Sequence, residues 1–413
     1  MMTKTLRLLH TSDWHLGRLL YGRKRYAEFA AFLDWLLDIL RAEGIDVLLV
    51  AGDIFDTTTP SNAAQTLYYR FLRRVAETGC RHVVVIGGNH DSPTFLDAPA
   101  ELLKMLDVHV VGAATDSPAD EVIALRDAEG GVEMLVCAVP YLRDRDLRRA
   151  EAGESPEDKE RKLAEGIQRH YAAVVEAALQ LNSALPQPVP VVGMGHLFTA
   201  GGQTVDGDGV RELYVGSLAH VTAGIFPEAL DYVALGHLHV PQAVGGREFV
   251  RYSGSPLAMG FGEAGQVKQV CVVEFVPEKT VRLLPVPVFQ RLERVTGDWP
   301  QIEARLTALK AEGEAVWLEV THTGHEVIDD LRERLDGLIA GSTLEVLKAR
   351  DARKALQVLN RQAQDETLDD LSPDEVFARC LDAGQVPPEQ RGELTQSFGE
   401  ILQALQEADL QAE

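Results

Sequence analysis

Short apolar runs followed at once by polar residues dominate the pattern of this chain. Five such runs have the length and β-branched composition of buried strands. In chain order, the polar clusters that follow them are Asp13-Trp14-His15, Asp53-Ile54-Phe55-Asp56, Asn89-His90-Asp91, His196 and His237-Leu238-His239. Because α/β proteins place their chemistry where strands open into loops, we expect these side chains to converge.

Helical spacing of apolar residues fills the gaps between the first three runs. Residues 26–43 repeat Phe and Leu every three to four positions and stop at Gly44. A second helix over residues 63–77 follows a cap at Thr59-Pro60-Ser61-Asn62, and a third is expected over residues 96–106. This alternation is typical of a sheet with parallel strands covered by helices.

The pattern from residue 108 to residue 285 predicts a second sheet. Strands are expected at residues 121–125 and 133–139, a long polar helix at 156–181, and mainly strands from 214 to 285. Hairpin turns are expected at Gly245-Gly246 and Glu278-Lys279. We therefore predict an α/β fold for residues 1–285, in which two sheets pack face to face and helices flank them.

Two smaller pieces follow a composition change at Pro285-Val286-Pro287. Residues 286–348 are predicted as a small α+β domain with helices at 301–311 and 327–339 and strands at 315–320 and 343–347. Residues 349–413 are predicted as a helical tail, whose last helix carries an apolar stripe at Leu394, Phe398, Ile401, Leu402 and Leu405. Such a stripe packs either on its own domain or on a partner.

The charge of the chain weakens a nucleic-acid-binding function without excluding it. The net charge is -23, and residues 351–413 hold fourteen acidic and five basic residues, whereas phosphate contacts need Lys and Arg. Bound divalent cations would offset some of the carboxylates. The four scattered cysteines predict no disulfide framework, and neither a signal peptide nor an apolar run of roughly 20 residues is present. We expect a cytoplasmic protein without membrane association.

Seven side chains from the five strand ends form a candidate metal site: Asp13, His15, Asp53, Asn89, His196, His237 and His239. Taken singly, each is more often a turn or core residue. Together they are too many for one ion and suit two. Oxygen and imidazole donors without thiolate favour manganese, iron or zinc. A carboxylate in the middle of the set would bridge the ions, and Asp53 is the candidate.

Such a site predicts hydrolysis of a phosphate ester. Two ions roughly 3.5 to 4 Å apart activate water and clamp a phosphoryl group, and they offset the charge that develops on its oxygens. His90, next to Asn89, is placed to assist the leaving oxygen. We expect Asp56 to orient the His90 imidazole.

The motifs resemble a known family. Five of them, Asp13-x-His15, Gly52-Asp53-x-x-Asp56, Gly88-Asn89-His90-Asp91, Gly195-His196 and Gly236-His237-x-His239, are similar to those of the calcineurin-like metallophosphoesterase superfamily. Within it, Thr11-Ser12-Asp13-Trp14-His15-Leu16-Gly17, Ala51-Gly52-Asp53-Ile54-Phe55-Asp56 and Tyr252-Ser253-Gly254-Ser255-Pro256 resemble the SbcD family of bacterial nuclease subunits.

The resemblance implies a catalytic centre with His90 as its catalytic histidine. It implies two Mn²⁺ ions, with other divalent metals as alternatives. Relatives from archaea and eukaryotes tend to carry histidine where this chain has Asp56, which favours orientation of His90 over direct contact with substrate. The implied ligands are Asp13, His15, Asp53 and His239 for one ion, and Asp53, Asn89, His196 and His237 for the other.

The same resemblance implies partners. These are a second copy of the chain, paired through helices near residues 63–74 and 96–106, and an SbcC-type, SMC-like ATPase, whose coiled-coil base would receive the C-terminal helices. A homodimer would thus become a heterotetramer, with residues 286–348 as a capping domain. The expected substrate is double-stranded DNA, cut at ends and hairpins by exonuclease and endonuclease action in DNA repair, recombination and replication.

Two alternatives stay open at this point. The chain could be a phosphatase or small-molecule phosphodiesterase, which would share the metal site but have little use for the regions after residue 285. It could also be a non-catalytic scaffold, although such proteins usually lose ligands or the histidine. A basic cluster, Arg18, Arg23, Lys24 and Arg25, is either a solvated helix start or a contact with DNA phosphates.

Overall fold

The computed structural model describes residues 6–147, 155–199, 221–275, 278–324, 328 and 330–352, together with the single positions 377, 381, 391, 394 and 398. These residues form two compact units. One extends to Glu293 and includes Ala315–Trp317, and the other holds the remaining residues from Arg294 onward. Beyond residue 352, the predicted helical tail lies outside the described residues except for those five positions.

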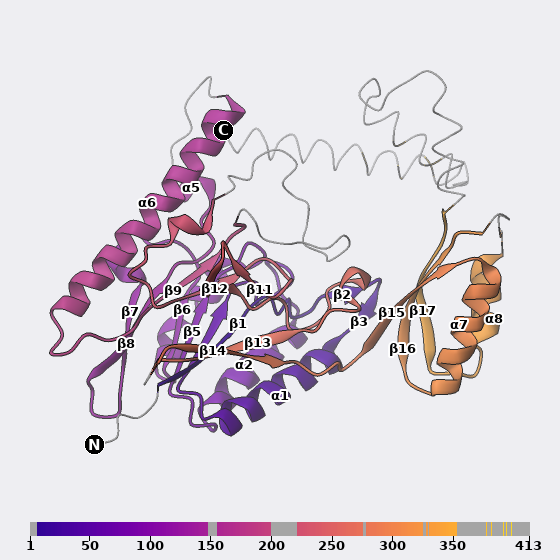
Figure 1. The fold of residues 1–413 in the computed structure, drawn as a ribbon, viewed down its shortest axis with the longest axis horizontal. Helices are drawn as coiled ribbons and strands as arrows, with labels where there is room; N and C mark the ends of the chain where they lie inside the picture. Colours follow the sequence, from indigo (N-terminus) through magenta and orange to yellow (C-terminus); the bar gives the residue numbers. More distant parts are fainter. Residues whose placement is uncertain are drawn as a thin grey trace. The chain divides into compact units, whose positions relative to one another are not determined.

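The first sheet has six strands in the order β14-β13-β1-β4-β5-β6 (Figure 1). Strands β1, β4, β5 and β6 are parallel, while β13 and β14 are antiparallel at one edge. The carboxyl ends of β1, β4 and β5 therefore meet at the same edge, and these ends carry the first three polar clusters. The bounds are Arg7–Thr11 for β1, Val47–Ala51 for β4, His82–Ile86 for β5, Val108–Val111 for β6, Gln269–Glu274 for β13 and Thr280–Pro285 for β14.

Two long helices pack on one face of this sheet, and the predicted signals are found at the end of the first and at the start of the second, although the second ends earlier than predicted, at Val75. Helix α1 (Tyr26–Glu43) ends at Gly44, whose φ of 61° is the left-handed conformation that glycine favours. Helix α2 (Asn62–Val75) begins at Ser61, whose hydroxyl accepts a hydrogen bond from the backbone N–H of Ala64. Their apolar faces bury the side of the sheet that carries Leu48 and Val83.

The helix predicted over residues 96–106 is wrong as a single element. Two short helices, α3 (Pro93–Asp97) and α4 (Ala100–Lys104), take its place. Pro99 lies between them, and because proline has no N–H to donate and clashes with the preceding turn, a continuous helix cannot form there.

A small hairpin directly follows the first polar cluster. Strands β2 (Leu19–Leu20) and β3 (Arg23–Lys24) pair antiparallel across a two-residue turn. Both turn residues, Tyr21 and Gly22, have positive φ, of 46° and 83°. This is the geometry of a type I′ turn, whose twist matches that of the flanking strands.

The second sheet also has six strands, in the order β11-β12-β10-β9-β8-β7. Its centre is parallel, and β7 and β11 are antiparallel at the two edges. The bounds are Val122–Arg126 for β7, Val132–Ala138 for β8, Val191–His196 for β9, Tyr232–Gly236 for β10, Gln242–Val244 for β11 and Arg247–Tyr252 for β12. The accompanying helices are α5 (Asp144–Leu147), α6 (Pro156–Ser183) and the 3₁₀ turns η1 (Pro118–Glu121), η2 (Ala223–Ile225) and η3 (Phe261–Glu263).

The two sheets share an apolar layer, which confirms the predicted sandwich. The layer combines side chains from both sheets, among them Leu8, Val47, Leu49, Val84, Met134, Val136, Val192 and Ala234. A separate apolar cluster joins the outer face of the second sheet to α6 through Tyr171 and Val174. Both cores exclude water from strands that end together, and this holds the polar clusters in place.

The second unit is a small α+β structure, as the sequence predicts. It holds most of a three-stranded sheet with the order β15-β16-β17 and the bounds Arg291–Gly297, Val316–His322 and Leu344–Asp351, and only the first residues of β15 and β16 belong to the first unit. Helix α7 (Trp299–Glu312) begins with a capping box between Asp298 and Gln301, and α8 is Leu331–Ile339. Strand β15 is an addition to the elements predicted from the sequence. None of the described helices has the length and apolar character needed to cross a membrane.

Candidate metal centre

The loops after β1 and β4 are joined by backbone hydrogen bonds. The N–H of Asp13 donates to the carbonyl oxygen of Gly52 (3.0 Å), and the N–H of His15 donates to that of Asp53 (2.9 Å). Because both loops are tied together beyond the ends of their strands, their side chains are held at one place. All seven predicted ligands lie at the carboxyl ends of β1, β4, β5, β9 and β10.

One group of donor atoms comes from Asp13, His15 and His239. Each offers an atom within 4.8 Å of the others, and the Nε2 atoms of His15 and His239 lie 3.2 Å apart. At that distance the two nitrogens either share one proton or both turn their lone pairs inward. In the second case a cation between them is the partner that satisfies both lone pairs.

A second group lies beside the first. Asn89 Oδ1 is 3.0 Å from His196 Nε2 and 2.9 Å from His237 Nδ1. Asp53 Oδ2 is 3.3 Å from His196 Nε2 and 3.6 Å from His15 Nε2. Asp53 therefore stands between the two groups, which is the position that a bridging carboxylate needs.

The backbone at this site is strained. Only six non-glycine residues in the described part of the chain have positive φ, and four of them are predicted ligands: Asp13 at 53°, His15 at 46°, Asp53 at 48° and His237 at 103°. Each such conformation costs on the order of 1 to 3 kcal/mol, and strain of this kind gathers at functional sites. The fold keeps these four side chains in place against local preference.

Glycines next to the ligands allow the loops to approach. A Cβ atom at Gly52 would lie 2.2 Å from His196 Nδ1, and one at Gly88 would lie 2.1 Å from Asp53 Oδ1. At Gly236 it would lie 1.8 Å from the carbonyl oxygen of Ala51, in the opposite sheet. Any side chain at these three positions would displace a ligand or part the sheets, so the glycines belong to the site.

The charges at the site are balanced by imidazoles. Among the described residues, no Lys or Arg forms an ion pair with Asp13 or Asp53. Burial favours protonated Asp53, but the neighbouring His196 and His15 outweigh it and hold the pKa of Asp53 well below its usual range. Burial also opposes a charged His196, yet Asp53 raises the pKa of His196 to about 9. Divalent cations would take the place of such protons.

His90 lies at the edge of the site. It is only half-buried, as is Asn89, whereas the other six predicted ligands are buried. Its ring centroid is 4.9 Å from that of His15. Its Nδ1 is 3.0 Å from the backbone carbonyl oxygen of Asp56. The hydrogen bond to His90 therefore comes from the Asp56 main chain, while a carboxylate oxygen of Asp56 lies within 4.8 Å of a His90 ring nitrogen. Orientation of His90 by that carboxylate stays a prediction.

The Asp56 carboxylate has other neighbours. Its Oδ1 accepts a hydrogen bond from Arg18 Nη1 (3.2 Å) and lies 3.5 Å from His15 Nδ1. A main-chain oxygen contacts His90 whatever the side chain is, so sequence reasoning about the residue type could not have assigned it.

Asp91 has a role that the sequence pattern does not predict, although the residue belongs to the Gly88-Asn89-His90-Asp91 motif. It is buried, and its carboxylate accepts hydrogen bonds from the N–H groups of Gly88 (2.9 Å), Ile54 (3.1 Å) and Phe55 (3.0 Å). Burial and the charge of Asp53 raise the pKa of Asp91 to about 6. Asp91 thus joins the loops after β4 and β5.

The basic cluster does not act as one group. Arg25 is 2% exposed, and its guanidinium donates to both carboxylate oxygens of Glu28 (2.7 and 2.9 Å). It is therefore neither a solvated helix start nor a surface for DNA. Arg23 and Lys24 are exposed on β3, and Arg18 contacts Asp56. Only these three remain candidates for a phosphate contact.

Comparison with known families agrees with this geometry. A family model described as calcineurin-like phosphoesterase matches residues 6–241. A second, described as Type 5 capsule protein repressor C-terminal domain, matches residues 288–384.

Relatives match along most of the chain. The chain is 38% identical over 404 residues to the SbcD subunit of nuclease SbcCD from Escherichia coli (strain K12), covering 97% of this chain and 98% of that protein. It is 36% identical over 359 residues to the SbcD subunit of nuclease SbcCD from Rhodobacter capsulatus, covering 81% and 87%. A solved dimetal phosphatase from Danio rerio aligns with a TM-score of 0.36 and 13% identity over 68% of this chain and 98% of that one. On the family match and the two relatives, this chain belongs to the calcineurin-like phosphoesterases and, within them, to the SbcD family of SbcCD nuclease subunits.

Proposed function

We propose that this chain is the nuclease subunit of an SbcCD-type complex and hydrolyses phosphodiester bonds of double-stranded DNA at ends and hairpins. The observation that carries the proposal is the place of Asp53 between two groups of donors, with His90 beside them. A dinuclear site next to a half-exposed histidine suits attack on a phosphodiester. Family membership selects DNA as the substrate.

The donor set fits two divalent ions, and we assign the ligands as predicted from the sequence. Asp13, His15, Asp53 and His239 would hold one ion, and Asp53, Asn89, His196 and His237 the other. The fit rests on the facing nitrogens of His15 and His239 and on the absence of a Lys or Arg beside Asp53 among the described residues. When bound, two such ions supply an activated water and polarise the phosphoryl group. Oxygen and imidazole donors suit Mn²⁺.

The protein's own part in the reaction is to hold and move protons. With its Nδ1–H donated to the Asp56 carbonyl oxygen, His90 keeps Nε2 as the nitrogen available to substrate. A proton on that atom would stabilise charge on the leaving oxygen. Asp91 and the three glycines keep the ligand loops from shifting while this occurs.

Digestion of a hairpin-ended duplex with Mn²⁺ and the SbcC-type ATPase tests the function. The wild type should cut it, and His90→Asn should bind Mn²⁺ normally but cut about 100-fold or more slowly, as expected for loss of a general acid. Bis-p-nitrophenyl phosphate is the control substrate. If the wild type hydrolyses only this ester under every partner and ATP condition, the chain is a small-molecule phosphodiesterase instead.

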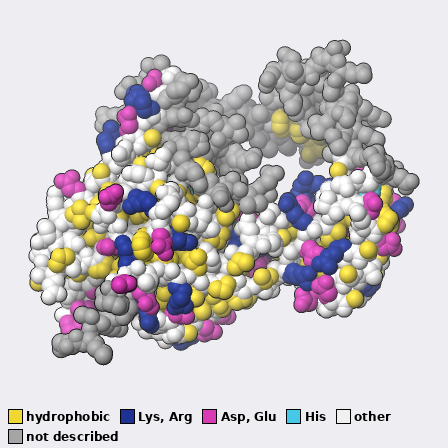
Figure 2. Space-filling view, viewed as in Figure 1, with side chains coloured by type: hydrophobic (Ala, Val, Ile, Leu, Met, Phe, Trp, Pro, Cys, Tyr) yellow, Lys and Arg dark blue, Asp and Glu magenta, His cyan; other side chains and the backbone are white. Residues whose placement is uncertain are grey.

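Contact with DNA phosphates is proposed for Arg18, Arg23 and Lys24. The described part of the face in Figure 2 mixes acidic with basic side chains, so broad electrostatic attraction is not favoured and local contacts matter more. Arg23 and Lys24 lie on the hairpin that follows Asp13 and His15. Replacing both by Ala should weaken DNA binding and its salt dependence while hydrolysis of the small ester is unchanged.

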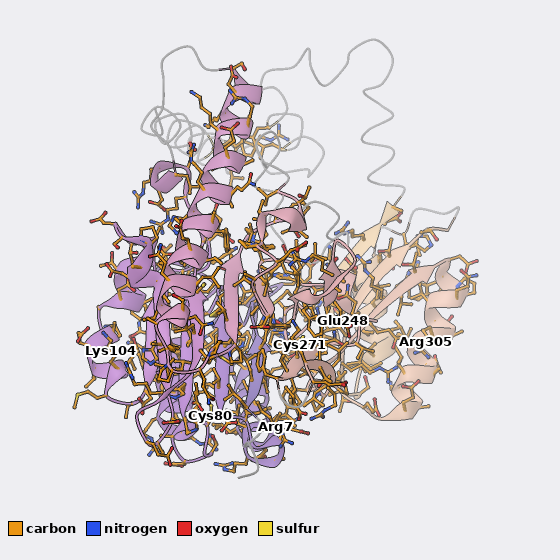
Figure 3. All side chains as sticks on the ribbon, turned by 60° about the vertical axis from the view of Figure 1, so that its left-hand side comes forward. Arg7, Cys80, Lys104, Glu248, Cys271 and Arg305 are labelled. Carbon is orange, nitrogen blue, oxygen red and sulfur yellow. The ribbon has the colours of Figure 1, made fainter. Side chains whose placement is uncertain are left out.

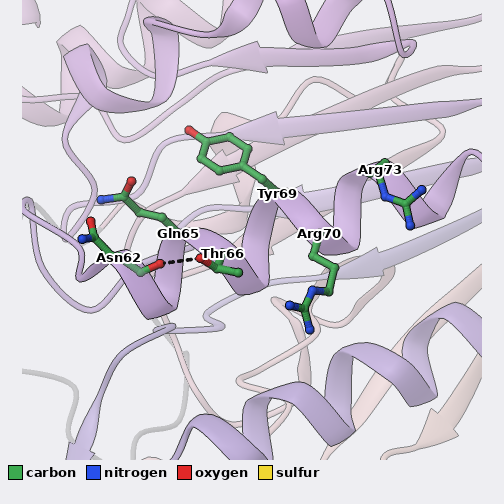
Figure 4. Close-up of a pocket in the computed structure, with 6 residues that line it drawn as sticks. All are labelled: Asn62, Gln65, Thr66, Tyr69, Arg70 and Arg73. Carbon is green, nitrogen blue, oxygen red and sulfur yellow. Dashed lines mark hydrogen bonds between the residues drawn. The ribbon is translucent and has the colours of Figure 1, made fainter.

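A homodimer is proposed through α2 and the α3–α4 region. Three apolar side chains there are exposed: Leu102 at 66%, Met105 at 80% and Leu106 at 43%. Exposed apolar groups of this size favour an interface. The outer side of α2 forms an open hollow (Figure 4) lined by Asn62, Gln65, Thr66, Tyr69, Arg70 and Arg73. Sedimentation of Met105→Asp should show a monomer if this face pairs.

Binding of the SbcC-type ATPase is proposed for the C-terminal helices, which lie outside the described residues except at the five positions named above. Removing residues after 350 should abolish co-purification with the ATPase and leave Mn²⁺ binding intact. The three cysteines described, Cys80, Cys137 and Cys271, are buried free thiols, which supports a reducing, cytoplasmic setting.

A further inference from the structure

A buried ion pair lies behind His239. Glu263 on η3 and Lys268 are 1% and 6% exposed, and their side chains are in direct contact. Neither residue is part of any predicted motif. Charged side chains are rarely buried to this extent unless each has several partners. The contacts of the pair therefore indicate its role.

The contacts of Glu263 connect the pair to the metal centre. Its Oε1 is 3.3 Å from His239 Nδ1. Its Oε2 accepts a hydrogen bond from the N–H of Met259 (3.0 Å) and lies 3.3 Å from Ser255 Oγ. One carboxylate oxygen thus faces the imidazole, while the other ties the carboxylate to its own loop.

Lys268 holds the same residues from the other side. Its Nζ donates to the carbonyl oxygen of His239 (3.1 Å), to Ser255 Oγ (3.0 Å) and to Gln266 Oε1 (3.2 Å). It therefore restrains the backbone of His239 while Glu263 restrains its ring. Phe261, also on η3, stacks on Tyr21 of the β2–β3 hairpin with ring centroids 5.5 Å apart. The turn that carries Glu263 is anchored at both ends.

The second ring nitrogens of two other ligand histidines have different neighbours. His196 Nδ1 is 2.9 Å from a backbone oxygen, that of Ala51. His15 Nδ1 is 3.5 Å from the Asp56 carboxylate, and within the described residues it has no hydrogen-bond partner. His239 differs from both, because its second nitrogen has a buried carboxylate in hydrogen-bond range. When the proton is on Nδ1, the lone pair of the ring is on Nε2, the nitrogen that faces His15.

We infer that Glu263 is a positioning residue, held by Lys268, which fixes the ring and tautomer of His239 so that Nε2 faces the ion shared with Asp13 and His15. The inference rests on the proposed metal site, but not on DNA as the substrate. Carboxylates behind a ligand histidine typically change metal affinity 10- to 100-fold.

Calorimetric titration of the chelator-treated, full-length chain with Mn²⁺ tests it. Glu263→Gln should leave one Mn²⁺ site at wild-type affinity and weaken the other about 10- to 100-fold. Hydrolysis of the small ester should need correspondingly more Mn²⁺, with kcat near wild type at saturation. Wild-type affinity at both sites would overturn the inference.

A second variant separates positioning from folding, because Glu263→Gln leaves Lys268 buried without its partner. Glu263→Gln combined with Lys268→Met removes both charges and should recover the melting temperature of the metal-free protein, but not the Mn²⁺ affinity. Recovery of both would mean that Glu263 serves only to neutralise Lys268, and the inference would fail. Glu319→Gln is the matched control: this buried glutamate pairs with Lys348 and Arg294 in the second unit, and its loss should leave both Mn²⁺ affinities unchanged.

These readouts distinguish the inference from the proposed function. If the wild type binds two Mn²⁺ and Glu263→Gln weakens one, but no DNA is cut, positioning by Glu263 stands and the nuclease proposal fails. If all variants cut DNA and need the same Mn²⁺ concentration, the nuclease proposal stands and positioning by Glu263 fails.

Discussion

Strand β4 has a buried aspartate at each end, and the two have opposite surroundings. Asp46 precedes the strand and Asp53 follows it, and they are 3% and 2% exposed. Between them the strand is wholly apolar and buried. The same strand therefore carries two buried carboxylates whose different partners can be compared directly.

Asp46 is neutralised within the protein. Its carboxylate accepts hydrogen bonds from the N–H of Arg7 (3.1 Å) and from Arg81 Nη2 (3.0 Å). Arg81 also pairs with Glu133, and Arg7 with Glu274 (2.8 Å). Figure 3 shows Arg7 and Cys80 at this same end of the sheet. Every charge here has a permanent partner, so the end serves stability.

Asp53 faces imidazoles instead of arginines, on a backbone with positive φ. In the proposed metal site, bound cations would complete the set of partners of Asp53. Burial of a carboxylate therefore does not by itself indicate function. The kind of partner does: a guanidinium completes a structural pair, whereas several imidazoles and a strained loop prepare a metal site.

The largest effect that tests this contrast is expected from Asp53→Asn. Loss of the charge that we propose would bridge the two ions should lower hydrolysis of the small ester about 1000-fold, equivalent to about 4 kcal/mol of transition-state stabilisation. Added Mn²⁺ should raise the urea midpoint of the wild type much more than that of the variant, because an ion that binds only the folded state stabilises it in proportion to its affinity. Urea unfolding with and without Mn²⁺ measures this. An equal Mn²⁺ stabilisation of both proteins would contradict it.

Asp46→Asn should show the opposite pattern. Breaking a largely buried charge pair should destabilise the protein by roughly 2 to 3 kcal/mol, measured by the same urea unfolding. Ester hydrolysis per folded molecule should stay within about twofold of wild type, since Asp46 lies at the far end of the strand. A large loss of kcat without loss of stability would show that the two ends are not separate.

The smallest expected effect is a pH-dependent loss of stability at the end of β4 that carries Asp46. Burial favours protonated Glu133, but hydrogen bonds from His82 and Arg81 outweigh it and lower the pKa of Glu133. A carboxyl whose folded pKa is depressed stabilises the protein above its unfolded pKa, and this stabilisation is lost as pH falls through the folded value. Glu133→Gln should therefore cost about 1 kcal/mol at pH 7 and progressively less from about pH 4 downward. Urea unfolding at pH 7, 5, 4 and 3 tests this, and a constant difference would refute it.

Most elements and the composition of the site could be predicted from the sequence, because both depend on local signals. Helix α1 has the predicted bounds, since its apolar spacing and Gly44 act within a few residues. The ligand types followed from polar residues placed directly after buried strands. Pro99 is a local signal of the same kind, since it divides the helix predicted over residues 96–106 into α3 and α4.

How those residues are held depends on the tertiary structure. The packed fold places a main-chain oxygen of Asp56 against His90, and it buries the Arg25 guanidinium beside the sulfur of Met259, 234 residues along the chain. It also brings Glu263, 24 residues along the chain, to the ring of His239. No local pattern encodes such contacts, because they depend on where two sheets and a 3₁₀ turn come to rest after the apolar layers have packed.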